Sequence, residues 1–214
     1  DAYNQNIQLV DTNVTETWVQ SGGVLYMRTE NNKTQIRGGF FSECVATSAG
    51  GVMYASTNNT LANVSECDIR DVRSTLAGGV VYLESGNQDF LLQRNTFLRC
   101  TVEAGHGGVV YAKEGNHYLT VQDCSTDECA TAFGNGGVLA LQQGNHFLRI
   151  SGLKTYNSSA QYGGVFYFNE SNNYAEIAQS EFHNCNASVS GGAGYLDRAN
   201  LALTMDDVAV TSSE

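Results

Sequence analysis

The residues of this chain that could do chemistry are a few histidines and one aspartate pair. His106 lies between two glycines, and Asp206 and Asp207 are adjacent; a histidine with two carboxylates could perform acid–base chemistry. His117 and His146 are 29 residues apart and could form a two-ligand metal site or a pH-sensitive pair. Each hypothesis depends on which side chains the fold brings together.

A repeat of glycine pairs determines that positioning. The pairs begin at residues 22, 50, 78, 107, 136, 163 and 191, so one unit of about 28 residues recurs through the chain, with 1–21 as a partial first coil. Self-similar units of this length are typical of solenoids and propellers, in which each unit buries its apolar face against its neighbours. We therefore expect one domain, residues 1–214.

Each unit contains short apolar runs in which apolar and polar residues alternate, as in strands, and no stretch keeps a helical period. Three strands and three turns in about 28 residues correspond to one coil of a right-handed parallel β-helix. The sequence therefore predicts an all-β solenoid of seven to eight coils, which start near residues 22, 50, 78, 107, 136, 163 and 191.

An asparagine recurs nine residues after the first glycine of each pair. Asparagine tolerates the left-handed backbone that ends a strand, and stacked amide side chains can hydrogen-bond from coil to coil. We expect such a ladder to consist of Asn4, Asn31, Asn59, Asn87, Asn116, Asn145, Asn172 and Asn200.

Three segments carry a resemblance to a known superfamily. Residues 78–82 read GGVVY, residues 95–100 read NTFLRC, and residues 179–185 read QSEFHNC. They resemble the GGxxY and FxxC/FxxN repeats of pectin-lyase-like parallel β-helix proteins, and are most similar to repetitive surface proteins of protists and polymorphic outer-membrane proteins of bacteria. The resemblance covers essentially the whole chain and implies the fold. It leaves function open, because that superfamily contains enzymes, adhesins and structural proteins.

The resemblance also bears on catalysis. Gly105-His106-Gly107 resembles a signature of polygalacturonases, and Asp206-Asp207 resembles their paired aspartates, but here the aspartates follow the histidine and the remaining signatures are missing. No column of the repeat collects acidic residues. We therefore expect no enzyme, no catalytic residue, no metal ligand and no cofactor, with His106, His117 and His146 as residues of turns.

The cysteines fall on two columns of the repeat that we expect to point inward. Only Cys100 and Cys129 share a column on adjacent coils, where strand spacing of ~4.8 Å between Cα atoms is compatible with a disulfide. The six are Cys44, Cys67, Cys100, Cys124, Cys129 and Cys185.

Composition favours an extracellular or cell-surface glycoprotein. The chain has Asn-x-Ser/Thr sequons at Asn13, Asn32, Asn58, Asn63, Asn157, Asn169 and Asn186. Because residue 1 is not methionine, we expect a signal peptide to have been removed. No apolar run reaches the length of a membrane span. A formal charge of −11 and a pI near 4.7 argue against a nucleic-acid partner.

The strand after each glycine pair is apolar on both faces, which predicts that other residues or a partner cover both faces of the strand. If one face lies in the core, the other forms an exterior stripe roughly 30 Å long that could meet a partner. The stripe would consist of Val24, Tyr26, Val52, Tyr54, Val80, Tyr82, Val109, Tyr111, Val165, Tyr167 and Tyr195.

The ends of the chain show no amphipathic cap, and its 214 residues contain no proline, where average usage would give about eleven. We therefore expect uncapped ends and a secreted structural glycoprotein that polymerises end to end, with lateral pairing along the stripe. Two alternatives stay open: a carbohydrate- or cell-binding adhesin module of a larger surface protein, and a polysaccharide lyase or hydrolase.

Overall fold

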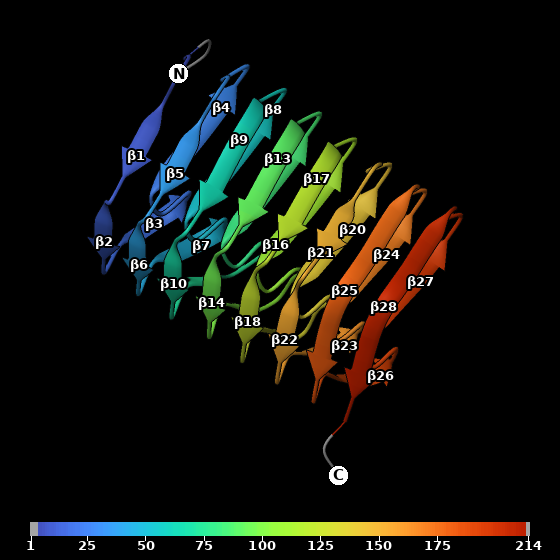
Figure 1. Ribbon diagram of the computed structural model, residues 1–214. Helices are drawn as coiled ribbons and strands as arrows, with labels where there is room; N and C mark the ends of the chain where they lie inside the picture. The colour runs from blue at the N-terminus through green and yellow to red at the C-terminus, as the bar shows by residue number, and fades with distance from the viewer. Residues whose placement is uncertain (1–3, 213–214) are drawn as a thin grey trace.

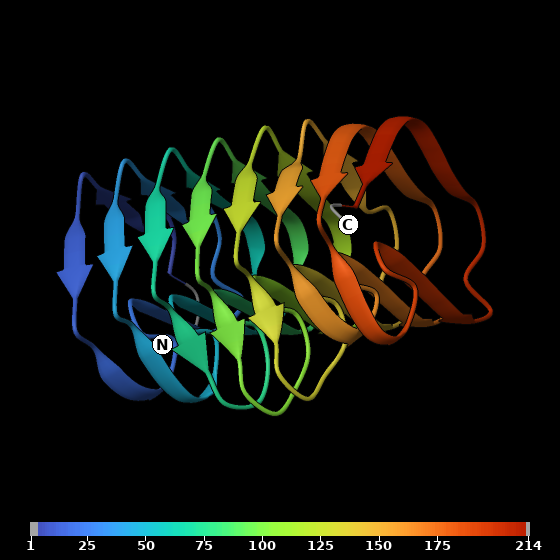
Figure 2. The same cartoon turned by 90° about the horizontal axis from the view of Figure 1, so that it is seen from below.

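The computed structural model describes residues 4–212, in which the predicted parallel β-solenoid is confirmed (Figure 1). It contains 28 strands and, within this range, no helix, and neighbouring strands are parallel and come from successive coils. Figure 2 shows the coils side by side along one axis. The predicted limits of the domain, residues 1 and 214, lie outside the described residues.

Two faces of each coil belong to sheets of seven strands. The first sheet contains β3 (Trp18–Ser21), β7 (Val45–Ala49), β11 (Arg73–Ser74), β15 (Thr101–Val102), β19 (Ala130–Thr131), β23 (Ser159–Tyr162) and β26 (Asn186–Ser190). The second contains β4 (Leu25–Thr29), β8 (Met53–Thr57), β12 (Val81–Ser85), β16 (Val110–Glu114), β20 (Leu139–Gln143), β24 (Phe166–Glu170) and β27 (Gly194–Arg198).

The third face is a 14-stranded sheet made of two rows. One row is β1 (Gln8–Val10), β5 (Gln35–Arg37), β9 (Thr60–Ser65), β13 (Gln88–Gln93), β17 (His117–Gln122) and β21 (Arg149–Ser151). The other is β2 (Asn13–Thr15), β6 (Phe40–Ser42), β10 (Asp68–Arg70), β14 (Thr96–Leu98), β18 (Ser125–Asp127) and β22 (Lys154–Tyr156). The nine-residue strands β25 (Ala175–His183) and β28 (Leu203–Thr211) extend along both rows.

Each coil therefore has three faces, as the prediction of three strands requires, and the face in the 14-stranded sheet is bent. Between the two rows the chain takes a positive φ, for example 57° at Glu66 and 50° at Arg94. Such a residue bends the backbone and divides the strand, so most coils carry four short strands in place of three.

The glycine pairs are required by the geometry of the turns. Gly78 has a φ of 55°, in the left-handed region that favours glycine. A Cβ atom on Gly79 would collide with the carbonyl oxygen of Gly108 in the next coil. The two glycines thus allow the turn to form and the next coil to approach closely.

The core is a continuous column of apolar side chains inside the solenoid. Inward positions of the 14-stranded sheet, such as Ile36, Val64, Leu92 and Ile150, are at most 1% exposed. Because each coil covers the next, the inner face of the first and last described coils is covered on one side only. Among residues 4–212, β1–β4 and β26–β28 accordingly have one paired edge.

The recurring asparagines form a hydrogen-bonded column along the solenoid, which we call the amide column. Asn31, Asn59, Asn87, Asn116, Asn145 and Asn172 are at most 4% exposed. The Asn59 side-chain amide donates to Asn87 Oδ1 at 2.9 Å, and equivalent bonds of 2.8–3.0 Å join the asparagines from Asn4 to Asn172. Asn200 accepts from the backbone N–H of Asn172 at 2.8 Å, so the column continues through all eight positions.

Candidate functional site

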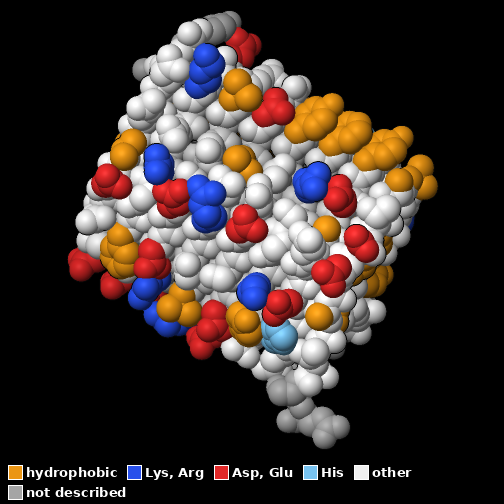
Figure 3. Space-filling model, in the orientation of Figure 1, with side chains coloured by type: hydrophobic (Ala, Val, Ile, Leu, Met, Phe, Trp, Pro, Cys, Tyr) orange, Lys and Arg blue, Asp and Glu red, His pale blue; other side chains and the backbone are white. Residues whose placement is uncertain are grey.

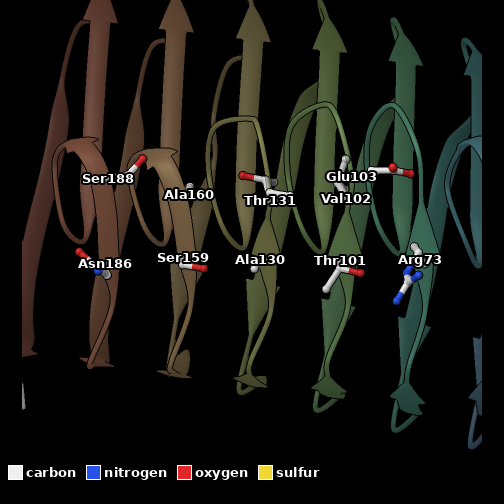
Figure 4. A pocket seen from close by; sticks show the side chains of 11 residues that line it. Arg73, Thr101, Val102, Glu103, Ala130, Thr131, Ser159, Ala160, Asn186 and Ser188 are labelled. Carbon is white, nitrogen blue, oxygen red and sulfur yellow. The ribbon is translucent and has the colours of Figure 1, made fainter.

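A groove of about 520 Å³ crosses the outer face of the sheet that contains β11, β15, β19, β23 and β26 (Figure 4). Its floor is shallow because the outward positions carry small side chains: Thr101 pairs with Ala130, and Ala130 with Ser159, on successive strands. It is lined by Arg73, Thr101, Val102, Glu103, Ala130, Thr131, Ala132, Ser159, Ala160, Asn186 and Ser188.

Figure 4 shows the lining side chains in two rows along the solenoid axis, in which hydroxyl and amide groups are interspersed with the apolar Val102, Ala130 and Ala160. Thr131 is 3% exposed, and within residues 4–212 its Oγ1 has no hydrogen-bond partner. Buried polar atoms are nearly always paired, so this hydroxyl is suited to a ligand that supplies a donor or acceptor. Glu103 is the one carboxylate in the lining, which contains no histidine. The lining therefore combines hydrogen-bonding groups with apolar side chains and has one carboxylate, whereas glycosidases use a pair.

His106 and the aspartate pair lie apart. The His106 ring stacks on Tyr111 and Tyr167 with centroid separations of 5.8 and 6.2 Å, and Nδ1 accepts from the backbone N–H of Asn135 at 3.1 Å. Burial lowers the pKa of His106. Asp206 lies in β28, in the 14-stranded sheet and several coils further along the chain. These positions do not form a catalytic group.

His117 and His146 are neighbours, as their shared repeat position predicts. Their rings stack 5.1 Å apart with an interplanar angle of 5°, and His146 Nδ1 accepts from the backbone N–H of Asn173 at 3.2 Å. Burial, and then the charge of His146, lower the pKa of His117. Two parallel rings do not converge on one ion. Within residues 4–212, no three His, Cys, Asp or Glu side chains are grouped to hold a metal.

One chemically suggestive cluster was missed in the sequence. Thr211 Oγ1 lies 2.7 Å from His183 Nδ1, and His183 Nε2 lies 3.2 Å from Glu181 Oε2. A hydroxyl, an imidazole and a carboxylate in this order resemble a nucleophile with its base. However, none of the three lines any of the described grooves, and Lys154 also pairs with Glu181 at 3.2 Å. The cluster is a surface contact between β25 and β28.

The six cysteines are free thiols. Cys100 and Cys129 are neighbours in the core, but the disulfide that their spacing allows is not formed. Burial, and then the hydrogen bond with Cys129, raise the pKa of Cys100 well above its usual value, so this thiol stays protonated.

The expected exterior stripe of valines and tyrosines is corrected by the structure. Val52, Val80, Val109 and Val165 are at most 1% exposed and belong to the core. The chain turns after each glycine pair, so the valine at the corner points inward instead of alternating as in a straight strand. Tyr26 is 49% exposed, but the tyrosines of the middle coils are largely covered.

The tyrosines form a stacked column outside the second seven-stranded sheet. Tyr82, Tyr111 and Tyr167 are 8–9% exposed, and they pack with Ala49 and Ala77 from the segments before the glycine pairs. Burial is the leading cause that raises the pKa of Tyr111 to about 12. The segment before each glycine pair thus covers the tyrosine column, which the alternation of side chains along a straight strand would leave in solvent.

A different aromatic column is exposed. Tyr118, Phe147 and Tyr174 are 48, 43 and 58% exposed, and adjacent rings stack with centroid separations of 4.9 and 5.1 Å. We call these three residues the aromatic ladder. Each lies two positions after an asparagine of the amide column, so reading that position of the repeat would have found it.

The sequon asparagines lie on the outer surface of the solenoid. Asn13, Asn58, Asn157 and Asn186 are exposed, and Asn32, Asn63 and Asn169 are half-buried. All seven positions have some solvent access, as attachment of a glycan requires.

Comparison of the chain with protein-family models, curated proteins and solved structures found no match. Between residues 4 and 212 there is no helix of the length and apolarity that crossing a membrane requires.

Proposed function

We propose that this chain is an extracellular structural glycoprotein that assembles end to end with copies of itself and catalyses no reaction. The repeat supports this function because every coil pairs with its neighbours through the same contacts. The outermost described coil accepts a further coil in the same way. The glycans and the net charge of −11 keep the outer surface hydrated.

The observation that carries the proposal is the contrast between two paired strands. Ile177 and Phe182 of β25 are fully buried, whereas Met205 and Val210, their partners on β28, are 47 and 56% exposed. Burying one such side chain contributes about 1.5–3 kcal/mol. A further coil in register would cover both and pair the free edge of β28.

Two sources could supply that coil: a second copy, as we propose, or further repeats of a longer chain. The intact mass of the native protein separates them. A mass above that of the 214 residues and their glycans, with a sequence that continues the 28-residue register, would assign the contact to one chain and favour an adhesin module.

Sedimentation velocity over a range of concentrations tests the assembly itself. The wild-type protein is expected to associate, and the variant Met205→Asp/Val210→Asp to remain monomeric, because buried carboxylates without partners are strongly unfavourable. The matched control is Thr204→Asp/Ala209→Asp, which adds the same two carboxylates at exposed positions next to Met205 and Val210 on the same strand. A wild-type protein that stays monomeric throughout would overturn the proposal.

The groove favours carbohydrate binding as a second candidate function. The hydroxyl and amide groups in its lining suit a neutral, hydroxyl-rich ligand, and Thr131 Oγ1 has no hydrogen-bond partner among residues 4–212. Calorimetric titration with neutral oligosaccharides tests it. Thr131→Val should reduce affinity about tenfold, since it removes one hydrogen bond at nearly constant shape. Thr120→Val, on the 14-stranded sheet, should leave affinity unchanged, and equal affinities for all three proteins would exclude the groove.

A further inference from the structure

The aromatic ladder is an exposed apolar row at the edge of the face formed by the 14-stranded sheet. Figure 3 shows hydrophobic side chains in a row along the upper right edge of this face. Tyr118, Phe147 and Tyr174 have positive φ values of 58, 60 and 61°. Glycine or asparagine adopts this backbone at lower cost, so the turn alone does not explain three large rings in solvent.

The arrangement of the rings limits what can bind them. Adjacent rings are nearly parallel, with interplanar angles of 7 and 8°, so Phe147 is covered on both faces and Tyr118 and Tyr174 on the face toward it, and the row presents mainly ring edges. Stacking of a sugar or a nucleobase needs a free ring face. A row of ring edges is instead suited to packing against another apolar surface.

Charged groups flank the ladder on one side. Arg149 and Glu176 lie on adjacent coils at the same repeat position, and their side chains form an exposed ion pair of 3.5 Å. A shallow hollow of about 410 Å³ separates them from Phe147 and Tyr174. The other side of the ladder carries His117 and His146. The ladder therefore has one charged border, with one cation and one anion a single coil apart.

We propose that the aromatic ladder is a lateral interface between two antiparallel copies of this chain. A two-fold axis perpendicular to the solenoid, midway between the coils of Phe147 and Tyr174, places Phe147 against the partner's Tyr174. The same axis places Arg149 against the partner's Glu176, and Glu176 against the partner's Arg149. The face is thus self-complementary in shape and charge, as a two-fold contact requires. The inference rests on the proposed self-assembly.

Of the seven sequons, Asn32 and Asn63 lie away from this contact, whereas Asn169 is five residues before Tyr174 in the chain. Asn63 pairs with Leu91, and Leu91 pairs with Thr120, so Asn63 lies two coils from the coil of Tyr118. Asn32 lies one coil further away. Glycans on these asparagines would leave the ladder free.

A mixing experiment tests the charged contacts between copies. Arg149→Glu and Glu176→Arg should each weaken lateral association about tenfold, because each variant alone places like charges opposite one another. An equimolar mixture should restore association, since the two carboxylates of an R149E copy then face the two guanidinium groups of an E176R copy. Repair of an intrachain ion pair cannot explain that recovery. A mixture that associates no better than either variant would overturn the inference.

The variant Phe147→Asn/Tyr174→Asn tests the two rings that meet at the two-fold axis, and it creates no new Asn-x-Ser/Thr sequon. Asparagine suits a positive φ, so the fold should persist by circular dichroism, while lateral pairing seen in electron micrographs should disappear. Single filaments from this variant, beside paired filaments from the wild type, would support both proposals. Unpaired wild-type filaments would refute only the lateral interface. Wild-type lateral dimers without filaments would refute only end-to-end assembly.

Discussion

The imidazole of His106 occupies the place that Ala140 leaves open in the tyrosine column. Tyr54 stacks on Tyr82 with a centroid separation of 4.7 Å, and Tyr111 follows at 5.5 Å with an interplanar angle of 32°. The next coil carries Ala140 at the same position. His106 reaches across from the segment before Gly107 and stacks on Tyr111 and on the tyrosine beyond the gap. The packing of the His106 ring thus explains both the absence of a tyrosine at position 140 and the histidine between Gly105 and Gly107.

This relationship predicts a compensating pair of substitutions. His106→Ala should lower the free energy of unfolding by about 1–3 kcal/mol through loss of buried contacts, and Ala140→Tyr by a similar amount because the new ring meets the imidazole. In the double variant the tyrosine fills the space, so the two losses should not add. Urea denaturation measures all four proteins. Additive losses would show that the two positions are independent.

The same histidine predicts a dependence of stability on pH. Burial lowers the pKa of His106 from its usual value of 6.5, so the folded state binds a proton less readily than the unfolded state. The protein should therefore lose stability as the pH falls below about 6.5, until the folded-state pKa is passed. His106→Phe should lose less stability than the wild type between about pH 7.5 and 5.5, a window that spans the unfolded-state pKa. Equal losses in denaturation midpoints would contradict this assignment.

The amide column predicts that replacing an asparagine lowers the free energy of unfolding by an amount that depends on how deeply the asparagine is buried. Asn116 accepts from the Asn87 amide and donates to Asn145 Oδ1, both within the core. Asn116→Ala should lower the free energy of unfolding by about 3 kcal/mol, because several buried polar groups lose their partners. Asn200 is half-buried, so Asn200→Ala should cost less. The comparison uses thermal or urea denaturation, and similar costs at both positions would argue against burial as the cause.

The sequons predict a pattern of glycan occupancy. Asn58 is exposed, whereas the side-chain oxygens of Asn32 and Asn63 are buried without hydrogen-bond partners. We expect higher occupancy at the exposed positions Asn13, Asn58, Asn157 and Asn186. Peptide mass spectrometry before and after enzymatic deglycosylation measures it. An unshifted mass of the native protein would remove the argument for the secretory pathway.

The fold was predictable because glycine and asparagine report backbone requirements directly. Gly79 marks a turn that the next coil approaches closely, and Asn116 marks a buried amide, so their spacing alone defines the coil. Side-chain exposure was less predictable, since Val80 lies at a corner and not in a straight strand. Covering of Tyr111 by His106 depends on a contact between two columns of the repeat across the glycine turn, which no single column displays.

The candidate sites also differ in whether the sequence predicted them. The stacked pair of His117 and His146 follows from their shared repeat position. The groove, by contrast, results from the small size of Ala130 and its neighbours, and small residues carry little sequence signal. The residues of the aromatic ladder share one position of the repeat and so could have been found from the sequence. Strand alternation instead predicted exposure of the tyrosines after the glycine pairs.

Negative-stain electron microscopy of the native, glycosylated protein tests the central claim of end-to-end assembly most directly. We predict continuous fibres with an axial repeat near ~35 Å, about the height of seven to eight stacked coils. Dispersed short rods at every protein concentration would contradict the claim.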